Sequence, residues 1–309
     1  MGRPYLSNGD LLNLDDLDMR IIRELGGSPL WNVRESYSNI SRKLGVDEET
    51  VRARVNRVKQ YGFIPAWRMM INPLLIDCRE AHLDLEVREE EHKADAISKV
   101  RTVDGVHYID DFRGKEILVG ICYENDESLA VKVRRIESIC ESSKLALWTS
   151  RFPRPDVRMS HLDWRIIDAM REDAWRDLEE IGKSLGVSGR TVQRRLTAMK
   201  EGKAVYLSRP PDVSVVGGLM CNFLVFCPDG QKKRAADQVI KSTFGRIGAF
   251  HTSPEEFSSF GISCENFSEA DKVTERLKAI DGVQSVRMRV VKEIVVVDDW
   301  LREQIAMRL

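Results

Sequence analysis

Residues 17–22 read Leu17-Asp18-Met19-Arg20-Ile21-Ile22, and residues 162–167 repeat the pattern as Leu162-Asp163-Trp164-Arg165-Ile166-Ile167. Two further matches follow in the same order: Leu44-Gly45-Val46 with Leu185-Gly186-Val187, and Thr50-Val51-x-x-Arg54 with Thr191-Val192-x-x-Arg195. The copies lie 145 residues apart at the first match and 141 apart at the last. The difference falls between the first and second helix, where the first copy has the longer loop. Ordered matches of this kind predict a tandem duplication.

Each copy begins with apolar residues at the spacing of amphipathic helices. In the first copy we expect helices from residue 17, over 35–44 and over 47–59, with a tight turn at Gly45. In the second copy we expect helices over 162–170 and 178–185 and a third helix that Ser188 caps. Short β-ribbons are expected at 63–71 and near 204–208. Three helices followed by a ribbon are typical of a winged helix-turn-helix.

The rest of each copy alternates between strands and helices. Strands are expected at 81–88, 106–111, 116–123 and 144–148, with helices at 92–103 and 126–140. The second copy repeats this order with strands at 220–227, 245–251, 256–264 and 283–291 and helices at 232–243 and 268–280. The order β-α-β-β-α-β is ferredoxin-like, with helices on one face of an antiparallel sheet. The fold class is therefore α+β.

The duplication divides the chain into four modules. We expect the first helix-turn-helix at 14–71, the first ferredoxin-like domain at 72–150, a linker and second helix-turn-helix at 151–209, and the second ferredoxin-like domain at 210–309. Two prolines and the lack of apolar periodicity predict an extended linker at 149–160. Residues 298–309 suggest a short amphipathic helix that covers the sheet or contacts another chain.

Three runs of the first copy carry a resemblance to a known family: Leu14-Asp15-x-x-Asp18-x-x-Ile21-Ile22-x-x-Leu25, Ile40-x-x-x-Leu44-Gly45-Val46, and Val51-x-x-Arg54-Val55-x-x-Val58. They resemble the Lrp/AsnC (feast–famine) family of transcription regulators, and residues 162–202 fit the same template. The resemblance implies double-stranded DNA as a partner and dimers formed through the ferredoxin-like sensing domains. It also implies a small-molecule effector at the interface of these domains, and further homo-oligomers. We therefore expect the two halves to form an intramolecular pseudo-dimer.

One turn departs from the family pattern. The family's sensing domain usually carries Gly-x-x-Asp before its third strand. This chain has Gly114-Lys115-Glu116 in the first copy and Ser253-Pro254-Glu255-Glu256 in the second.

The formal net charge of the whole chain is −1, which at first argues against nucleic acid. Counted by module, however, the first helix-turn-helix has ten basic and eight acidic residues, and the second has thirteen and nine. The first sensing domain has eleven basic and seventeen acidic residues, and the second has thirteen and fourteen. Because attraction to phosphate is local, basic helix-turn-helix modules can bind DNA while the acidic domains face away.

The third helix of each helix-turn-helix is the expected recognition helix. The candidate DNA-contacting residues are Glu49, Arg52, Arg54, Arg57 and Lys59 in the first module and Arg190, Gln193, Arg194, Arg195 and Lys200 in the second. Arg190 and Gln193 suit guanine and adenine contacts. The alternative interpretation is that these basic residues form only a solvent-exposed face of the helix.

The two recognition helices differ in their first turn, which is acidic in the first module and basic in the second. We therefore expect a non-palindromic DNA site. We also expect Arg190→Ala with Arg194→Ala to weaken binding more than Arg52→Ala with Arg57→Ala.

His107 and His251 fall on the second strand of the two sensing domains, at roughly equivalent places. They leave open a siroheme-decarboxylase-like tetrapyrrole enzyme built from Lrp-like halves. Ordinary hydrogen-bonded strand histidines are the competing interpretation, and a ligand-sensing adaptor that no longer binds DNA is a third. We expect no enzyme activity, since both recognition helices retain their arginines, and no cofactor, since nucleotide-binding glycine loops are absent.

Other classes of protein are excluded by the sequence. No apolar run approaches the ~18–20 residues that span a bilayer, and residues 1–12 do not resemble a signal peptide. The six cysteines lack any Cys-x-x-Cys pair, which indicates reduced, mostly buried thiols and no metal site. The expected location is cytoplasmic.

Overall fold

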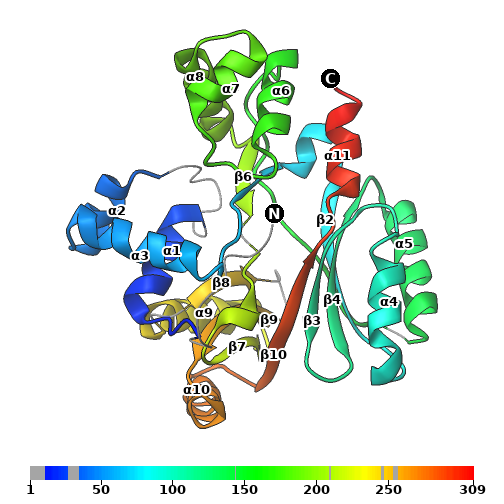
Figure 1. Ribbon diagram of the computed structural model, residues 1–309. Helices are drawn as coiled ribbons and strands as arrows, with labels where there is room; N and C mark the ends of the chain where they lie inside the picture. The colour runs from blue at the N-terminus through cyan, green and yellow to red at the C-terminus, as the bar shows by residue number, and fades with distance from the viewer. Residues whose placement is uncertain (1–10, 27–34, 143, 209, 245–246, 253–256) are drawn as a thin grey trace. The chain divides into compact units, whose positions relative to one another are not determined.

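The computed structural model describes residues 11–26, 35–142, 144–208, 210–244, 247–252 and 257–309, with backbone only at 247–252 (Figure 1). The long loop of the first copy and the turn at 253–256 lie outside these residues. Among the described helices, none combines the length and apolar character needed to cross a lipid bilayer. All six cysteines are buried free thiols, as predicted.

Two sets of three helices occupy the places that the repeated sequence predicts. The first set is α1 (Asp16–Gly26), α2 (Tyr37–Leu44) and α3 (Glu48–Gln60). The second set is α6 (His161–Met170), α7 (Leu178–Leu185) and α8 (Gly189–Glu201). The predicted inward faces are confirmed, because Val51, Val55 and Val58 on α3 and Val192, Leu196 and Met199 on α8 are all buried.

The prediction of a separate ribbon in each half is wrong. Each predicted ribbon supplies a single strand, β1 (Arg68–Ile71) or β6 (Val205–Ser208), and these two strands pair antiparallel with each other. Met70 lies opposite Tyr206 in this two-stranded sheet. A strand needs a partner for its backbone N–H and C=O groups, and here the partner comes from the other copy.

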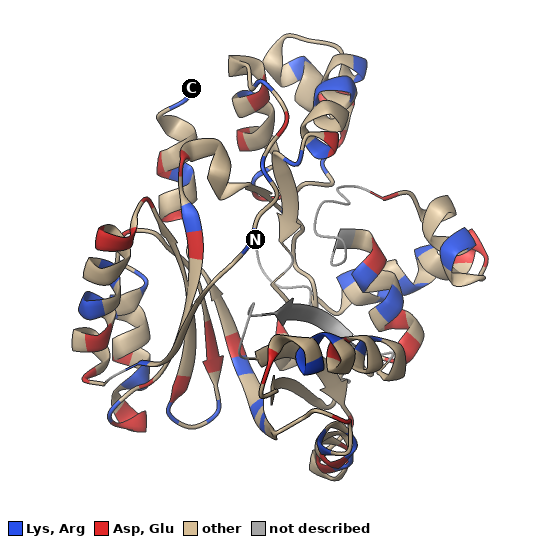
Figure 2. Cartoon of the chain, turned by 180° about the vertical axis from the view of Figure 1, so that it is seen from behind, with Lys and Arg blue, Asp and Glu red and all other residues tan. Residues whose placement is uncertain are grey.

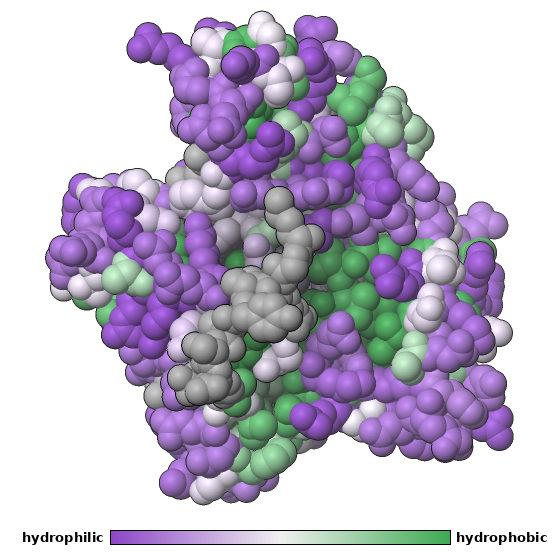
Figure 3. Space-filling view, in the orientation of Figure 1, coloured by the Kyte–Doolittle hydropathy of each residue, from purple (hydrophilic) through white to green (hydrophobic). Residues whose placement is uncertain are grey.

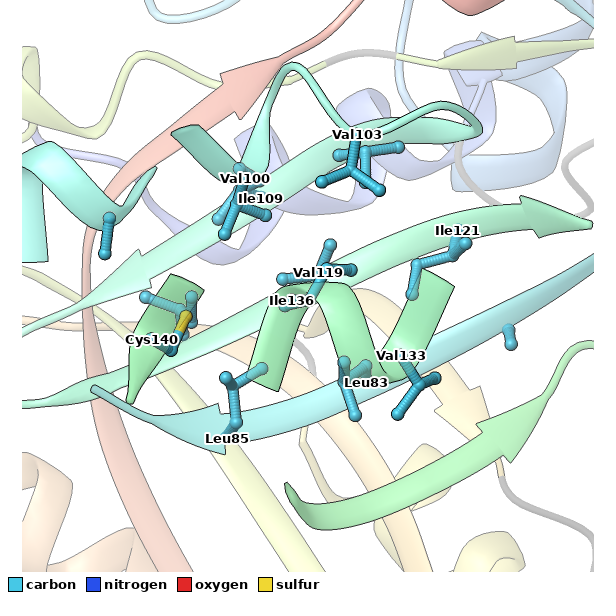
Figure 4. Close-up of a cluster of buried hydrophobic side chains, with 14 of the residues drawn as sticks. Leu83, Leu85, Val100, Val103, Ile109, Val119, Ile121, Val133, Ile136 and Cys140 are labelled. Carbon is cyan, nitrogen blue, oxygen red and sulfur yellow. The ribbon is translucent and has the colours of Figure 1, made fainter. Parts of the chain in front are cut away.

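The first βαββαβ segment forms the sheet β5-β2-β4-β3. Its strands are β2 (Arg79–Glu86), β3 (Val106–Phe112), β4 (Glu116–Tyr123) and β5 (Lys144–Thr149). The helices α4 (Lys93–Val100) and α5 (Asp126–Cys140) cover one face, where Leu83, Ile109, Val119 and Ile136 are fully buried (Figure 4). Two 3-10 turns, Pro73–Ile76 and Glu90–His92, precede β2 and α4.

The second βαββαβ segment repeats this order as β10-β7-β9-β8. Its strands are β7 (Leu219–Phe226), β8 (Ile247–Thr252), β9 (Phe257–Cys264) and β10 (Ser285–Val296). The helices are α9 (Gly230–Thr243) and α10 (Phe267–Lys278), and a 3-10 turn at Val213–Val215 precedes β7. Cys221, Phe223 and Phe260 lie in the core of this segment. The predicted α+β fold is confirmed in both halves.

The chain forms two compact units that do not follow its two halves. One unit contains residues 1–27, 35–65 and 211–293, so the first helix-turn-helix lies with the second sheet. The other contains residues 66–210 and 294–309, so the second helix-turn-helix lies with the first sheet. We call these units A and B.

The C-terminal segment forms α11 (Asp299–Ala306) in unit B, where Trp300, Leu301 and Ile305 are buried. The Arg308 guanidinium lies over the aromatic ring of Trp164 on α6, with its Cζ 5.4 Å from the ring centroid. Asp298, just before α11, pairs with Arg68 of β1 and lies 3.9 Å from Arg171 at the end of α6. The helix therefore supports the second helix-turn-helix.

Candidate nucleic-acid interface

Short capping motifs place the recognition helix of each helix-turn-helix. In the first, Gly45 ends α2 with a left-handed φ of 69°, and the Asp47 side chain then accepts the backbone N–H of Thr50 at the start of α3. In the second, Gly186 has φ 75° and the Ser188 side chain accepts the N–H of Thr191. Glycine adopts this backbone conformation without steric cost, so the turn between the helices stays tight.

The second recognition helix exposes the beginning of its outer face. Arg190, Gln193 and Arg194 are exposed, and the Gln193 side chain donates to the Thr197 hydroxyl at 3.2 Å. Lys200 is half-buried near the end of the helix. The N-terminal part of a recognition helix contacts base edges in the known motif. These residues therefore form a compact polar surface of the composition that DNA recognition requires.

Arg195 lies on a different side of the same helix. Its Nε donates to Asp163 Oδ1 at 2.6 Å, and a second guanidinium nitrogen pairs with the other carboxylate oxygen. Asp163 belongs to α6 and has no exposed surface. Burial would raise the pKa of Asp163, but hydrogen bonds from Arg195 and Ser160 outweigh burial and lower it. This bidentate pair fastens α8 to α6.

The first module has the same pair at the equivalent positions. Arg54 on α3 pairs with Asp18 on α1 at 3.1 Å and also with Asp15, while Arg57 pairs with Asp18 as well. Asp18 is fully buried. Sequence reasoning placed Arg54, Arg57 and Arg195 at the DNA interface, whereas in the structure they hold helices together. The available signal was the aspartate that both copies place after the repeated leucine.

The first recognition helix keeps fewer available cations on its outer face. Arg52 bonds Glu48 at 2.9 Å and lies over the Tyr37 ring, with its Cζ 5.3 Å from the centroid. Glu49 and Lys59 are exposed. The first turn of this helix is thus acidic, and Arg52, which is exposed, is engaged with a neighbouring glutamate.

Charged residues of both signs mark the helices of the two modules (Figure 2). The surface that these modules present in Figure 3 is mainly hydrophilic. The two recognition helices nevertheless differ at equivalent positions. The second has Arg190 and Arg194 where the first has Glu49 and Ala53. The two modules therefore share a scaffold and differ in the side chains that a ligand would meet.

His107 and His251 both lie on the second strand of their segments, as predicted, but their positions in the strand register differ. In the strand register, Tyr108 faces Gly120 and Ala249 faces Gly261, so Ala249 is the counterpart of Tyr108 and Gly248 that of His107. His251 faces Ser259 and corresponds to Asp110, which faces Leu118. The two histidines therefore do not form a matched pair, and the side chain of His251 lies outside the described residues. Among the described side chains, no group of three or more His, Cys, Asp or Glu is arranged to hold a metal ion.

The model of the AsnC-type helix-turn-helix domain matches residues 14–59 and 159–200. A helix-turn-helix transcriptional regulator of Pyrococcus horikoshii, itself uncharacterised, is 32% identical over 149 residues, covering 45% of this chain and 88% of the relative. The chain belongs to the Lrp/AsnC family of helix-turn-helix transcriptional regulators. The regulator Ptr1 of Methanocaldococcus jannaschii is 43% identical over 60 residues, covering 19% of this chain and 38% of Ptr1.

A solved structure shows the tandem arrangement in a single chain. The siroheme decarboxylase NirDL superposes with a TM-score of 0.56 over 95% of this chain and 99% of its own, at 12% sequence identity. At this identity the likeness concerns the fold. It supports a tandem of helix-turn-helix and ferredoxin-like domains.

Proposed function

We propose that this family member binds double-stranded DNA in a sequence-specific way, mainly through α8, and regulates transcription from the bound site. The observation that carries the proposal is the exposed pair Arg190 and Arg194 on a recognition helix whose other arginine, Arg195, is fixed to Asp163. An arginine near the start of a recognition helix suits the two acceptors of guanine, and one a turn later suits a phosphate.

The proposed DNA-contacting set is Arg190, Gln193, Arg194 and Lys200 on α8, with Glu49, Arg52 and Lys59 on α3. We leave out Arg54, Arg57 and Arg195 because their ion pairs stabilise the modules. Linking two unlike modules in one chain raises the effective concentration of each for the other's DNA segment. The proposal includes the sensing domains as an intramolecular pseudo-dimer and as the site of a small-molecule effector, both of which the family resemblance implies.

The test is binding to DNA from the chain's own upstream region across a salt series. The slope of log affinity against log salt is about −0.9 per neutralised phosphate, so a slope steeper than about −3 with a preference over unrelated DNA supports the proposal. Arg190→Ala with Arg194→Ala should weaken binding at least about tenfold and reduce the slope by about one.

The matched control is Arg52→Ala on the first recognition helix, which should weaken binding less because Arg52 is already engaged with Glu48. Equal binding of the double variant and the wild type would contradict the proposal. Equal binding to all DNA sequences would contradict its sequence specificity.

A tetrapyrrole enzyme is the alternative from the sequence, and the likeness to NirDL covers its fold. His82, on β2 of the first sheet, uses both ring nitrogens in contacts with Tyr108 and Ser150, each 2.6 Å away, so neither nitrogen would be available to hold a tetrapyrrole iron. His107 lacks a counterpart in the second copy. The residues therefore fit a tetrapyrrole poorly. Purified protein with a Soret absorption band would overturn this conclusion.

A further inference from the structure

The linker before α6 carries exposed arginines beside the end of the recognition helix α8. Residues 150–160 form no helix or strand. Within this segment the sequence reads Arg151-Phe152-Pro153-Arg154-Pro155-Asp156-Val157-Arg158, with three basic residues and one acidic residue. All three arginines are exposed, and none of them forms an ion pair with another residue that the structure describes.

The exposure of the linker residues alternates along the chain. From residue 154 to residue 160, exposed residues alternate with half-buried ones, and the half-buried residues are Pro155, Val157 and Met159. An extended segment that lies on a surface has this period of two, because successive side chains point to opposite sides. Arg154 and Arg158 therefore share the side of the linker that faces solvent.

A buried asparagine fastens the linker to the turn that follows α8. Asn72 has no exposed surface, and its side-chain nitrogen donates to the carbonyls of both Pro153 and Lys203 at 2.8 Å. An amide group has two such donors, so both are used here. The backbone N–H of Asp156 also donates to the Gly202 carbonyl at 2.8 Å. The linker is thus bound to the end of the recognition helix at two points.

A glycine at the end of α8 allows the linker to approach this closely. A Cβ atom on Gly202 would lie 2.7 Å from both the Asp156 carbonyl oxygen and Val157 Cβ. Phe152 packs against Tyr206 of β6, with ring centroids 5.7 Å apart. The arginines therefore extend from a backbone whose position is fixed by contacts on both sides. A fixed backbone reduces the conformational entropy that is lost when a ligand binds.

The end of α8 continues the basic surface of the linker. Lys200 follows Gln193 by seven residues, which is about two helical turns, so the two side chains share one side of α8. Lys203, in the turn after α8, is half-buried like Lys200. We define the linker patch as Arg151, Arg154, Arg158, Lys200 and Lys203. Asp156 and Glu201 lie in the same stretches, so five basic side chains stand beside two acidic ones.

The linker arginines belong to the second copy alone. At the 145-residue offset of the first helices, the equivalent residues of the first copy are Leu6, Gly9 and Asn13. The helix-turn-helix scaffold therefore does not require arginines at these positions. Among the described residues, β6 pairs with β1 and not with a neighbouring strand of its own module. The linker, and not a hairpin, thus flanks the end of α8.

We propose that the linker patch binds phosphates of double-stranded DNA beside the bases that α8 contacts. This inference rests on the proposed function and adds a second contact surface to it. Guanidinium groups match phosphate oxygens with two parallel hydrogen bonds, and the linker arginines have no internal carboxylate to satisfy them. Because a helix rises about 1.5 Å per residue, Gly202 lies about 18 Å along α8 from Arg190. The patch therefore meets the DNA backbone away from the base contacts of Arg190.

Phosphate contacts have a consequence that separates the linker patch from the start of α8. All DNA sequences have the same backbone, so these contacts add affinity for every sequence and leave the preference between sequences unchanged. Arginines that contact base edges, in contrast, contribute to the preference itself. Variants of the two surfaces should therefore differ in which of these two quantities they change.

The test measures the affinity of the full chain for two duplexes of equal length across a salt series. One is DNA from the chain's own upstream region, and the other has an unrelated sequence. We expect Arg151→Ala with Arg154→Ala and Arg158→Ala to weaken binding to both duplexes about equally, by at least about tenfold. The slope of log affinity against log salt should become shallower by about two to three. Arg→Lys at the same three positions should restore most of the slope, because lysine also neutralises phosphate.

The matched control removes three positive charges from the first sensing domain. Arg101→Ala with Arg134→Ala and Arg135→Ala changes the net charge equally, at exposed positions at the end of α4 and on α5. Its salt slope should stay within about 0.5 of the wild-type slope. An equal loss of slope in the control would overturn the proposal, because the net charge of the chain would then explain the effect.

The remaining outcomes separate the linker patch from the proposed function. A linker variant with the wild-type slope on both duplexes would overturn the patch and leave the proposed function intact. A loss confined to the upstream duplex would overturn the assignment to phosphates. If Arg190→Ala with Arg194→Ala binds like the wild type while the linker variant loses affinity for both duplexes, the patch is supported and the proposed role of α8 is wrong. A chain that binds neither duplex at low salt would overturn both proposals.

Discussion

Arg190 and Arg195 stand five residues apart on α8 and have opposite surroundings. Arg190 is exposed near the start of the helix, whereas Arg195 grips the fully buried Asp163. The guanidinium group is therefore exposed at one position and paired with a buried carboxylate at the other. Helical periodicity separates the two faces of α8, but the aspartate that meets Arg195 comes from another helix.

We expect Arg195→Ala to reduce the free energy of unfolding by about 2–3 kcal/mol. This is below the ~3–5 kcal/mol typical when one partner of a fully buried pair is removed, because the Arg195 side chain is 27% exposed. Urea denaturation followed by circular dichroism measures the change. The neighbouring Arg194→Ala is the control and should stay within about 0.5 kcal/mol. Equal stabilities of the two variants would contradict the structural role of Arg195.

The sequence predicted the two recognition helices and their exposed residues, but it did not reveal that three of the arginines it selected pair with carboxylates of their own modules. Arg54, Arg57 and Arg195 are basic residues on a recognition helix, and such residues usually meet phosphate. Whether an arginine meets phosphate or an internal carboxylate depends on the crossing of two helices, which side-chain spacing within one helix does not contain.

At the scale of elements, the turn between α7 and α8 depends on a glycine. A Cβ atom on Gly182 would lie 2.7 Å from the Val187 carbonyl oxygen and 2.8 Å from the Gly189 nitrogen. The Val187 N–H also donates to the Gly182 carbonyl at 2.9 Å. The helix and the following turn therefore approach closely at this position. The first module has Ser41 at the corresponding place, 141 residues earlier, so its own turn accommodates a side chain.

Gly182→Ala should destabilise the second module by about 1–3 kcal/mol, because backbone atoms would have to move apart. We also expect weaker DNA binding, since α8 would shift against α7. The measurement combines urea denaturation with a DNA titration. Lys183→Ala, on the exposed side of the same helix, is the control and should leave both quantities unchanged. An equally small effect of Gly182→Ala would show that the turn accommodates a Cβ atom at this position and would contradict the prediction.

The sequence pattern did not predict which strands pair with each other. The apolar runs at 68–71 and 205–208 were recognisable as strands, yet each was expected to form its own ribbon. Four-residue strands contain little information about their partners, because hydrogen bonding is made by the backbone and is the same for any sequence. Only the fold brings β1 opposite β6.

For the whole molecule, the duplication links two recognition helices that have diverged. A homodimer presents two identical surfaces and favours a palindrome, whereas α3 and α8 present different residues at equivalent positions. Glu49, Arg52 and Ala53 stand where the second helix has Arg190, Gln193 and Arg194. The chain therefore carries two copies of one helix-turn-helix scaffold with unequal recognition surfaces.

Selection from random DNA should return a site without two-fold symmetry. The control is the triple variant Glu49→Arg, Arg52→Gln, Ala53→Arg, which gives α3 the exposed side chains of α8 at three exposed positions. It should select a site with more nearly equal halves. A palindrome selected by the wild type would contradict the asymmetric interface, and identical sites for both proteins would show that α3 does not read bases.

The sequence by itself determined the duplication, the order of elements, the recognition helices and the family. These features depend on local periodicity and on residues that repeat along the chain. Tertiary structure alone decided that β1 pairs with β6 and that Asp18 and Asp163 engage the inner arginines. It also decided that each helix-turn-helix forms a unit with the other half's sheet, and that Asn72 fastens the linker to the turn after α8. These contacts join residues far apart in the chain, and which of many compatible partners meet is settled only when the whole chain packs.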